Sequence, residues 1–93
     1  MIERRVTVIN RLGLHARAAA RLVRTASAYR SAVRIERADG SAAAEDAKSI
    51  LSVLMLAAAR GTELRATAEG IDEQEALDAV CALISSGFGE MEG

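Results

Sequence analysis

Apolar and polar residues alternate with a period of two in three segments of the chain, a pattern typical of strands that bury one face. The three segments are residues 2–8, 31–37 and 63–69. The dipeptide Asp39-Gly40 follows the second segment and favours a type I′ hairpin turn, because both central positions of that turn need a positive φ. A short further strand is therefore expected at residues 41–44.

Two other segments carry apolar residues at helical spacing. In residues 16–28 an apolar face lies opposite a cationic face, which Arg17, Arg21 and Arg24 form at positions i, i+4 and i+7. Residues 50–58 carry the second set of apolar residues at helical spacing. This segment is so strongly apolar that we expect most of the helix to be buried.

The last helix has a well-marked start and end. Asp72 is expected to be its N-cap, with Glu75 as the reciprocal partner of a capping box. Ile71 is placed to pack onto Ala76 as a hydrophobic staple. Gly87 is the expected C′ residue that ends the helix.

The expected order of elements is βαββαβα, in a chain whose 93 residues are the size of one domain, residues 1–93. Strands that are apolar on one side only favour an antiparallel sheet with one open face. The predicted fold is therefore an α/β (α+β) two-layer sandwich, in which three helices cover one face of a four-stranded antiparallel sheet.

Hydrophobic residues make up 51% of the chain and charged residues 27%, which is enough apolar material for a core. One Phe, one Tyr and no Trp leave little aromatic surface for stacking bases, so nucleic-acid partners are disfavoured. No apolar run reaches roughly eighteen residues and residues 1–5 are charged, so we expect a cytoplasmic protein without membrane insertion. The single cysteine, Cys81, is expected to be buried and cannot form an internal disulfide.

Charge is unevenly distributed, although the net charge is only −1. Up to Arg37 the chain has nine arginines against Glu3 and Glu36, a balance of +7. The remainder has three basic residues against eleven acids, a balance of −8. Two interpretations stay open: an ordinary solvated surface, or a local positive field around a site that holds an anion.

His15, the only histidine, stands where the first expected helix begins. The first N–H groups of a helix lack partners and lie at the positive end of its dipole, so this position favours an anion. Neutral imidazole is also a nitrogen nucleophile near pH 7. Because Gly13 allows close backbone approach and Arg17 can donate charge-assisted hydrogen bonds, the segment suits a histidine that accepts a phosphoryl group.

The spacing alone leaves one alternative, a surface histidine that merely caps a helix. A metal site is disfavoured because no carboxylate or thiol is close to His15 in the sequence. A hydrolase is disfavoured because no serine stands in a local relation to His15.

Residues 10–17 (NRLGLHAR) look like the active-site signature of the HPr family, the histidine-containing phosphocarriers of the phosphoenolpyruvate-dependent phosphotransferase system. Residues 48–58 (KSILSVLMLAA) resemble its second signature, around a regulatory serine, and residues 70–76 and 86–89 are similar as well. Two separated motifs in the right order are more specific than either alone, and the resemblance covers essentially the whole chain.

The resemblance implies that His15 takes a phosphoryl group on Nδ1 from phosphorylated enzyme I and passes it to an enzyme IIA domain. Arg17 then matches the family's arginine that stabilises the phosphoryl oxygens. Transfer between two histidines needs positioning and charge neutralisation, so no metal or cofactor is expected on the carrier. We expect a monomeric carrier protein that is not itself an enzyme.

Ser49 matches the serine that an HPr kinase/phosphorylase modifies in some members, and its alternative role is that of an ordinary helix-capping serine. A phosphate is tolerated near a helix start, and it would repel partners from a neighbouring apolar surface. The apolar candidates for partner docking are Ile50, Leu51 and Leu54, which could equally be core. The expected cationic rim around them consists of Arg17, Arg21 and Arg24.

Two departures from the family pattern stand out. Ala18 occupies a position where many members have proline, so the first helical turn lacks the restraint on φ that proline gives. The stretch 41–47 is slightly longer than usual, and Glu45 and Asp46 place negative charge near Ser49. This second departure bears on recognition of Ser49 by a kinase more than on the chemistry of His15.

Two other functions stay open beside the phosphocarrier. One is a regulatory interaction module of the same fold, controlled by phosphorylation of Ser49 and without a role in transport. The other is a small-molecule-binding α/β domain, in which substitution of His15 would have no effect.

Overall fold

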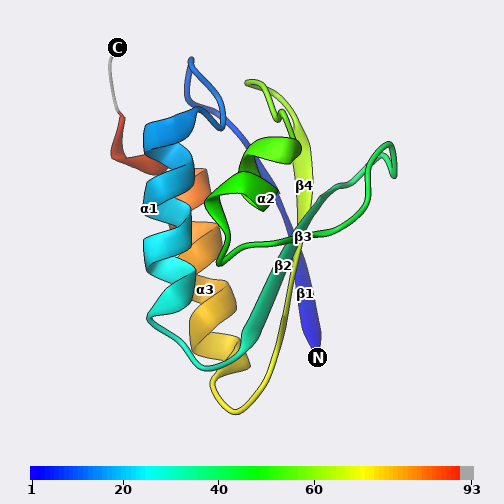
Figure 1. Cartoon of the computed structure of the whole chain (residues 1–93), viewed down its shortest axis with the longest axis vertical. Helices are drawn as coiled ribbons and strands as arrows, with labels where there is room; N and C mark the ends of the chain where they lie inside the picture. The colour runs from blue at the N-terminus through cyan, green and yellow to red at the C-terminus, as the bar shows by residue number, and fades with distance from the viewer. Residues whose placement is uncertain (91–93) are drawn as a thin grey trace.

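Four strands and three helices follow one another in the order βαββαβα, as the sequence predicts (Figure 1). The computed structural model describes residues 1–90. The strands are β1 (Ile2–Thr7), β2 (Ala32–Arg37), β3 (Glu45–Asp46) and β4 (Glu63–Glu69). The helices are α1 (Ala16–Ser27), α2 (Ile50–Met55) and α3 (Glu73–Ser85), and a 3₁₀ turn, η1 (Gly87–Gly89), follows α3.

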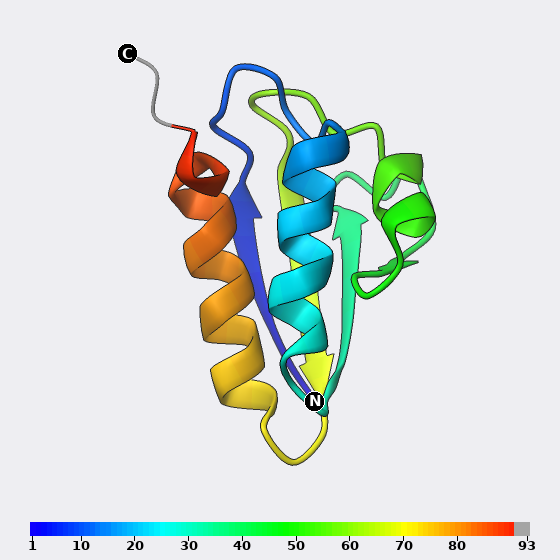
Figure 2. The same cartoon turned by 60° about the vertical axis from the view of Figure 1, so that its left-hand side comes forward.

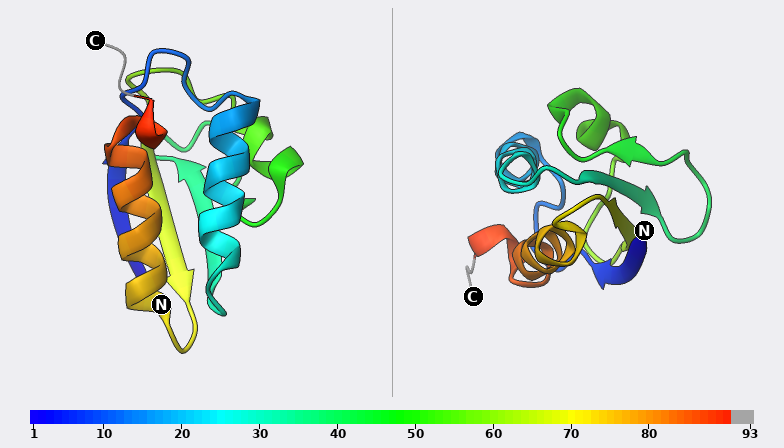
Figure 3. Two further views of the ribbon diagram at one scale, coloured as in Figure 1. Left: turned by 90° about the vertical axis from the view of Figure 1, so that its left-hand side faces the viewer. Right: turned by 90° about the horizontal axis from the view of Figure 1, so that it is seen from below.

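The strands form one antiparallel sheet in the order β1-β4-β2-β3. Helices α1 and α3 lie side by side over one face of this sheet, and α2 lies beside α1 near β3 (Figures 2 and 3). The opposite face is open and carries charged side chains, such as the pair in which Arg65 Nη1 donates to Glu36 Oε1 at 2.9 Å. The predicted open-faced two-layer sandwich is thus confirmed.

The core lies between the sheet and the helices and consists mainly of aliphatic side chains. The alternation in β2 and β4 buries every second residue, and the apolar faces of α1 and α3 close over them. Cys81 is buried as expected. The largest fully buried apolar side chains are Phe88, Leu22, Ile35, Leu56, Leu64, Leu77, Ile84, Val8, Val33, Val53 and Val80.

The prediction of a strand at residues 41–44 is wrong, because the third strand is the two-residue β3 at Glu45–Asp46. Of the two turn residues only Gly40 has a positive φ, so the turn is not type I′ and does not begin a tight hairpin. Three successive alanines offer no β-branched side chain to hold a strand. Pairing resumes where Ala47, which is fully buried, donates its N–H to Val33 O at 2.9 Å.

The prediction that residues 50–58 are mostly buried is also wrong. Helix α2 has only six residues, of which Val53 alone is buried. Leu51 exposes 76% of its surface and Met55 exposes 70%. One side of α2 packs on α1 and β3, so its other side faces solvent. Ala57, with φ +49, then turns the chain away from the helix.

The expected capping box of α3 is absent, although Gly87 does end the helix with φ +72. The Asp72 carboxylate turns to the start of β2 instead, where it accepts from the Ser31 hydroxyl at 2.5 Å and from the backbone N–H groups of Arg30 and Ser31 at 2.9 Å. The hydrogen bond from the Ser31 hydroxyl, together with these N–H groups, lowers the pKa of Asp72 to about 2. Ile71 is 85% exposed and forms no staple.

The start of α1 and the end of α3 lie at the same end of the molecule (Figure 2). The loop that leads into α1 and the turn that follows α3 therefore meet there. Among residues 1–90, no helix is long and apolar enough to be a transmembrane segment.

Candidate functional site

His15 is the N-cap of α1, with φ −80° and ψ 179°. Its Nδ1 accepts a hydrogen bond from the backbone N–H of Arg17 at 3.3 Å, so the ring faces the first amides of the helix. The side chain is 28% exposed. The first turn of α1 contains no acidic residue, and the positive end of the helix dipole is therefore not neutralised from within the helix.

The loop before His15 is held close to the segment that follows α2. Leu14 donates its N–H to Ala58 O at 2.9 Å. Gly13 has φ +66, and a Cβ atom at this position would lie 2.6 Å from Ala58 O. Only glycine combines this φ with so close a contact to backbone, so Gly13 fixes the path of the chain into His15.

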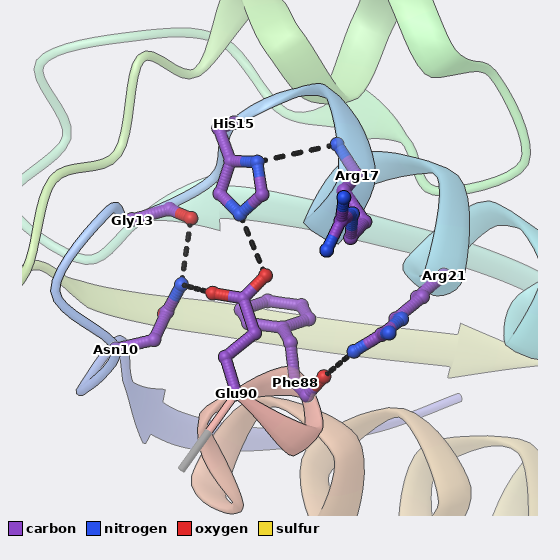
Figure 4. A network of polar contacts seen from close by, with 7 residues as sticks. All are labelled: Asn10, Gly13, His15, Arg17, Arg21, Phe88 and Glu90. Atoms are coloured by element: carbon purple, nitrogen blue, oxygen red, sulfur yellow. Dashed lines mark hydrogen bonds and ion pairs between the residues drawn. The ribbon is translucent and has the colours of Figure 1, made fainter. Parts of the chain in front are cut away.

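A carboxylate contacts the other ring nitrogen of His15 (Figure 4). Glu90 Oε2 lies 2.6 Å from His15 Nε2, and Glu90 Oε1 accepts from Asn10 Nδ2 at 3.0 Å. Asn10, which is only 4% exposed, also donates from Nδ2 to Gly13 O at 2.8 Å. The loop before α1 and the turn after α3 are therefore joined through Glu90.

The Glu90 carboxylate is 12% exposed, and its environment affects its ionisation. Burial acts to raise the pKa of Glu90, but hydrogen bonds from Asn10 and His15 and the charges of His15 and Arg21 outweigh this effect. The net result is a lowered pKa, so Glu90 is ionised at neutral pH. An ionised carboxylate only accepts hydrogen bonds.

An open hollow of about 680 Å³ lies in front of His15. Three arginines and one carboxylate face it, so the hollow is net positive and suits a small anion. Among residues 1–90, no three His, Cys, Asp or Glu side chains are grouped so that they could hold a metal ion. The lining residues are Arg11, Leu12, His15, Arg17, Arg21, Gly89 and Glu90.

The arginines predicted from the face of α1 do not all reach this hollow. Arg17 and Arg21 line it, and the Arg21 guanidinium also donates to Phe88 O. Arg24 is exposed in the last turn of α1, outside the hollow. The structure thus brings the first two arginines to His15 and leaves the third apart.

Ser49 is the N-cap of α2, where its Oγ accepts from the Ser52 N–H at 3.3 Å. Beside it, Ile50 and Leu51 are 44% and 76% exposed. Leu54, in contrast, is partly buried against the core. Of the three apolar docking candidates, two form an exposed patch and one supports the fold.

Two residues of the site escaped the sequence reasoning. Asn10 belongs to the signature 10–17, but that reasoning assigned it no role of its own. No local pattern marked Glu90, because its partner His15 lies 75 positions earlier. The sequence does contain one signal for Glu90. The glycines on both sides of Phe88 indicate a tight turn after the last helix, and this turn determines where Glu90 lies.

Comparison with known proteins agrees with the observed fold. A family model described as "PTS HPr component phosphorylation site" matches residues 2–86. Phosphocarrier protein HPr of Cupriavidus necator is 48% identical over 92 residues, which cover 99% of this chain and all of the relative. Phosphocarrier protein HPr of Pseudomonas aeruginosa is 49% identical over 87 residues, which cover 94% of each chain.

A solved structure is similar over nearly the whole chain. The crystal structure of HPr-C-His from Thermoanaerobacter tengcongensis has a TM-score of 0.90 and 39% sequence identity, covering 99% of this chain and 100% of that one. The chain belongs to the HPr family of phosphocarrier proteins of the phosphotransferase system.

Proposed function

We propose that this phosphocarrier accepts a phosphoryl group on His15 from phosphorylated enzyme I and passes it to an enzyme IIA domain, in a cytoplasmic relay. The observation that carries the proposal is the position of His15 Nδ1. This nitrogen faces the unneutralised start of α1, inside a hollow that Arg17 and Arg21 line. A surface histidine that merely caps a helix would not need this arrangement of arginines.

The transfer step needs no group beyond the two histidines and the cations around them. The Nδ1 lone pair of His15 attacks phosphorus and forms a new N–P bond. The N–P bond to the donor histidine breaks, and its electron pair returns to the donor nitrogen. After transfer, the Arg17 N–H, which donates to Nδ1 in the unphosphorylated protein, and the Arg17 guanidinium, which lines the hollow, bind the phosphoryl oxygens.

The proposed docking surface for both partners surrounds this hollow. Ile50 and Leu51 provide an exposed apolar centre beside α1, and Arg17, Arg21 and Arg24 provide a cationic rim. Such a surface suits a transient partner with an acidic rim. Because Leu54 is partly buried, its contribution to docking is smaller than the sequence suggested.

A regulatory role for Ser49 is a second proposal, which its position supports. The Ser49 hydroxyl lies at the start of α2 next to the exposed Leu51, so a phosphate there places about two negative charges beside the docking surface. Incubation with a host kinase and ATP, followed by peptide mapping, tests the proposal. Phosphate on Ser49 supports it, and phosphate only elsewhere contradicts it.

The experiment for His15 uses phosphoenolpyruvate, Mg²⁺ and cognate enzyme I. We expect one phosphate per chain, labile in acid and stable in alkali, and none in His15→Ala. A phosphate that survives His15→Ala, or no phosphate on the unchanged protein, contradicts the proposal.

Arg17→Ala should slow the transfer and leave the fold intact, because the side chain is exposed. Arg34→Ala is the matched control, since Arg34 is an exposed arginine on β2, outside the hollow. Equal transfer rates for these two variants would remove the role proposed for Arg17.

A further inference from the structure

The position of Glu90 follows from the packed core. Phe88 is fully buried, and its φ of +58 turns the chain sharply after α3. The Arg21 guanidinium holds the Phe88 carbonyl oxygen, and Gly89, with φ +73, continues the turn. The carboxylate two residues after Phe88 is thereby carried to His15, as Figure 4 shows.

Two independent contacts assign the same tautomer to His15. Because the Glu90 carboxylate only accepts, the hydrogen bond at 2.6 Å requires the proton on Nε2. The Arg17 N–H can donate to Nδ1 only if Nδ1 keeps its lone pair. Both contacts therefore leave Nδ1 as the nucleophilic nitrogen.

Glu90 is itself held by a side chain from another part of the chain. Asn10 Nδ2 donates to Glu90 Oε1 and to Gly13 O, and the two acceptors fix the orientation of the amide. In this orientation Asn10 Oδ1 is buried with no hydrogen-bond partner among the described residues. The amide thus gives up one hydrogen bond while it holds the carboxylate against His15.

We propose that Glu90 is a positioning residue for phosphoryl transfer: its carboxylate keeps the proton of His15 on Nε2 and points Nδ1 at the start of α1. This inference rests on the proposed function of His15. When the Nδ1–P bond forms, the ring becomes cationic and retains its proton on Nε2. The Glu90 charge then lies beside that proton and compensates the ring.

Glu90 does not block the place of the phosphoryl group. It contacts Nε2, whereas the N–H of Arg17 contacts Nδ1, and these are different atoms of the ring. The arrangement corresponds to a carboxylate that orients a histidine; in metal sites, loss of such a partner lowers metal affinity or activity about 10- to 100-fold.

The test compares Glu90→Gln and Glu90→Ala with the unchanged protein. Glu75→Gln is the matched control, because it makes the same chemical change at an exposed residue near the start of α3, at the opposite end of the molecule (Figure 1). We expect kcat for phosphorylation by enzyme I to fall about tenfold in Glu90→Gln, with KM unchanged. In Glu90→Ala part of the phosphate should move from Nδ1 to Nε2, which ³¹P and ¹⁵N spectra of the ring resolve.

A second readout needs neither enzyme I nor phosphate. In the unphosphorylated protein, ¹⁵N spectra of the His15 ring at alkaline pH should show the proton on Nε2, and Glu90→Ala should show exchange between both tautomers. Unchanged ring spectra, or rates and phosphate positions equal to those of Glu75→Gln, overturn the role of Glu90. Faster transfer in Glu90→Ala also overturns it. If the unchanged protein takes no phosphate, the proposed function fails, and the ring spectra still decide whether Glu90 positions His15.

Discussion

The two long helices begin in opposite ways. Helix α3 carries Glu73 and Glu75 in its first turn, so its own acids neutralise the positive end of the dipole. Helix α1 has no acid there and begins with a histidine whose Nδ1 faces the first amides. The end that is neutralised internally stabilises the fold, and the end that is left open is free to stabilise an incoming anion.

The same contrast holds for the residues before each helix. Asp72 uses its carboxylate to tie α3 to the start of β2, where three donors satisfy it. His15 leaves Nδ1 with one long contact to a backbone amide, and it lies in an open hollow lined by arginines. The carboxylate before α3 has all its donors within the fold and serves structure, whereas the imidazole before α1 is left partly unsatisfied and is suited to binding.

The largest effects are expected when the glycine before each helix is changed to alanine. These two changes should separate the role of the α1 start in transfer from the role of the α3 start in stability. Gly13 and Gly70 both have positive φ, and an added Cβ would lie 2.6 Å from Ala58 O in one case and from Ser31 Oγ in the other. Each change to alanine should lower the free energy of unfolding by about 2 kcal/mol or more. Gly13→Ala should also slow phosphoryl transfer about 100-fold, because it displaces the loop that carries His15.

Denaturant unfolding and the initial rate of phosphorylation measure these two effects. Gly70→Ala serves as the control for loss of stability alone. If Gly70→Ala slowed transfer as much as Gly13→Ala, the loop before α1 would have no special part in the site.

Giving α1 an acid like those of α3 should have the next largest effect. Ala16→Glu introduces a carboxylate at the exposed first residue of the helix. Stability should rise by about 0.5 kcal/mol through the helix dipole. Transfer should fall about tenfold, because the added charge opposes the incoming phosphoryl group.

The control for Ala16→Glu is Ser27→Glu, which adds the same charge at the exposed last residue of α1. Its transfer rate should remain close to that of the unchanged protein. If Ala16→Glu left the transfer rate unchanged, the open positive end of α1 would not contribute to the reaction.

At α3, the effect of Asp72→Asn should depend on pH. The pKa of Asp72 is lowered from 3.8 to about 2 in the folded protein. The ionised carboxylate therefore stabilises the fold above pH 3.8, and this stabilisation is lost as the pH falls from 3.8 towards 2. Asp72→Asn should lower the thermal unfolding midpoint at pH 7, and the difference from the unchanged protein should shrink towards pH 2 and vanish below it. A difference as large at pH 2 as at pH 7 would contradict the role of this carboxylate.

The smallest effect is expected for Glu75→Gln. Removing one exposed charge from the first turn of α3 should lower stability by about 0.3 kcal/mol at low ionic strength. High salt should remove the difference, because it screens the dipole. Thermal unfolding at two salt concentrations measures this, and a larger loss that salt did not affect would show a contact other than the dipole.

The sequence predicts those parts of the fold that depend on local periodicity. Alternation around Val33 and Ile35 and the helical spacing around Leu22 locate the elements and their buried faces, because each pattern repeats within a few residues. The same local reasoning places His15 and Arg17 at the start of α1. It does not say whether an apolar face is covered, so the sequence left Leu51 open between core and docking surface, and the structure shows that it is exposed.

The sequence does not show which residues far apart in the chain contact each other. Asp72 matched a capping motif, yet its hydrogen-bond partner is Ser31, 41 positions earlier. Glu90 reaches His15 only because the turn after α3 and the loop before α1 meet at one end of the molecule. Short-range patterns describe caps and faces, whereas tertiary packing decides which groups a side chain finds.

The central proposal is that Nδ1 of His15 receives the phosphoryl group at the open end of α1. The most direct measurement is the ³¹P–¹⁵N coupling in protein that carries ¹⁵N-labelled histidine and has been phosphorylated with phosphoenolpyruvate and enzyme I. We predict that phosphorus is coupled to Nδ1 of His15. Phosphorus coupled to Nε2, or to no ring nitrogen, would contradict the account.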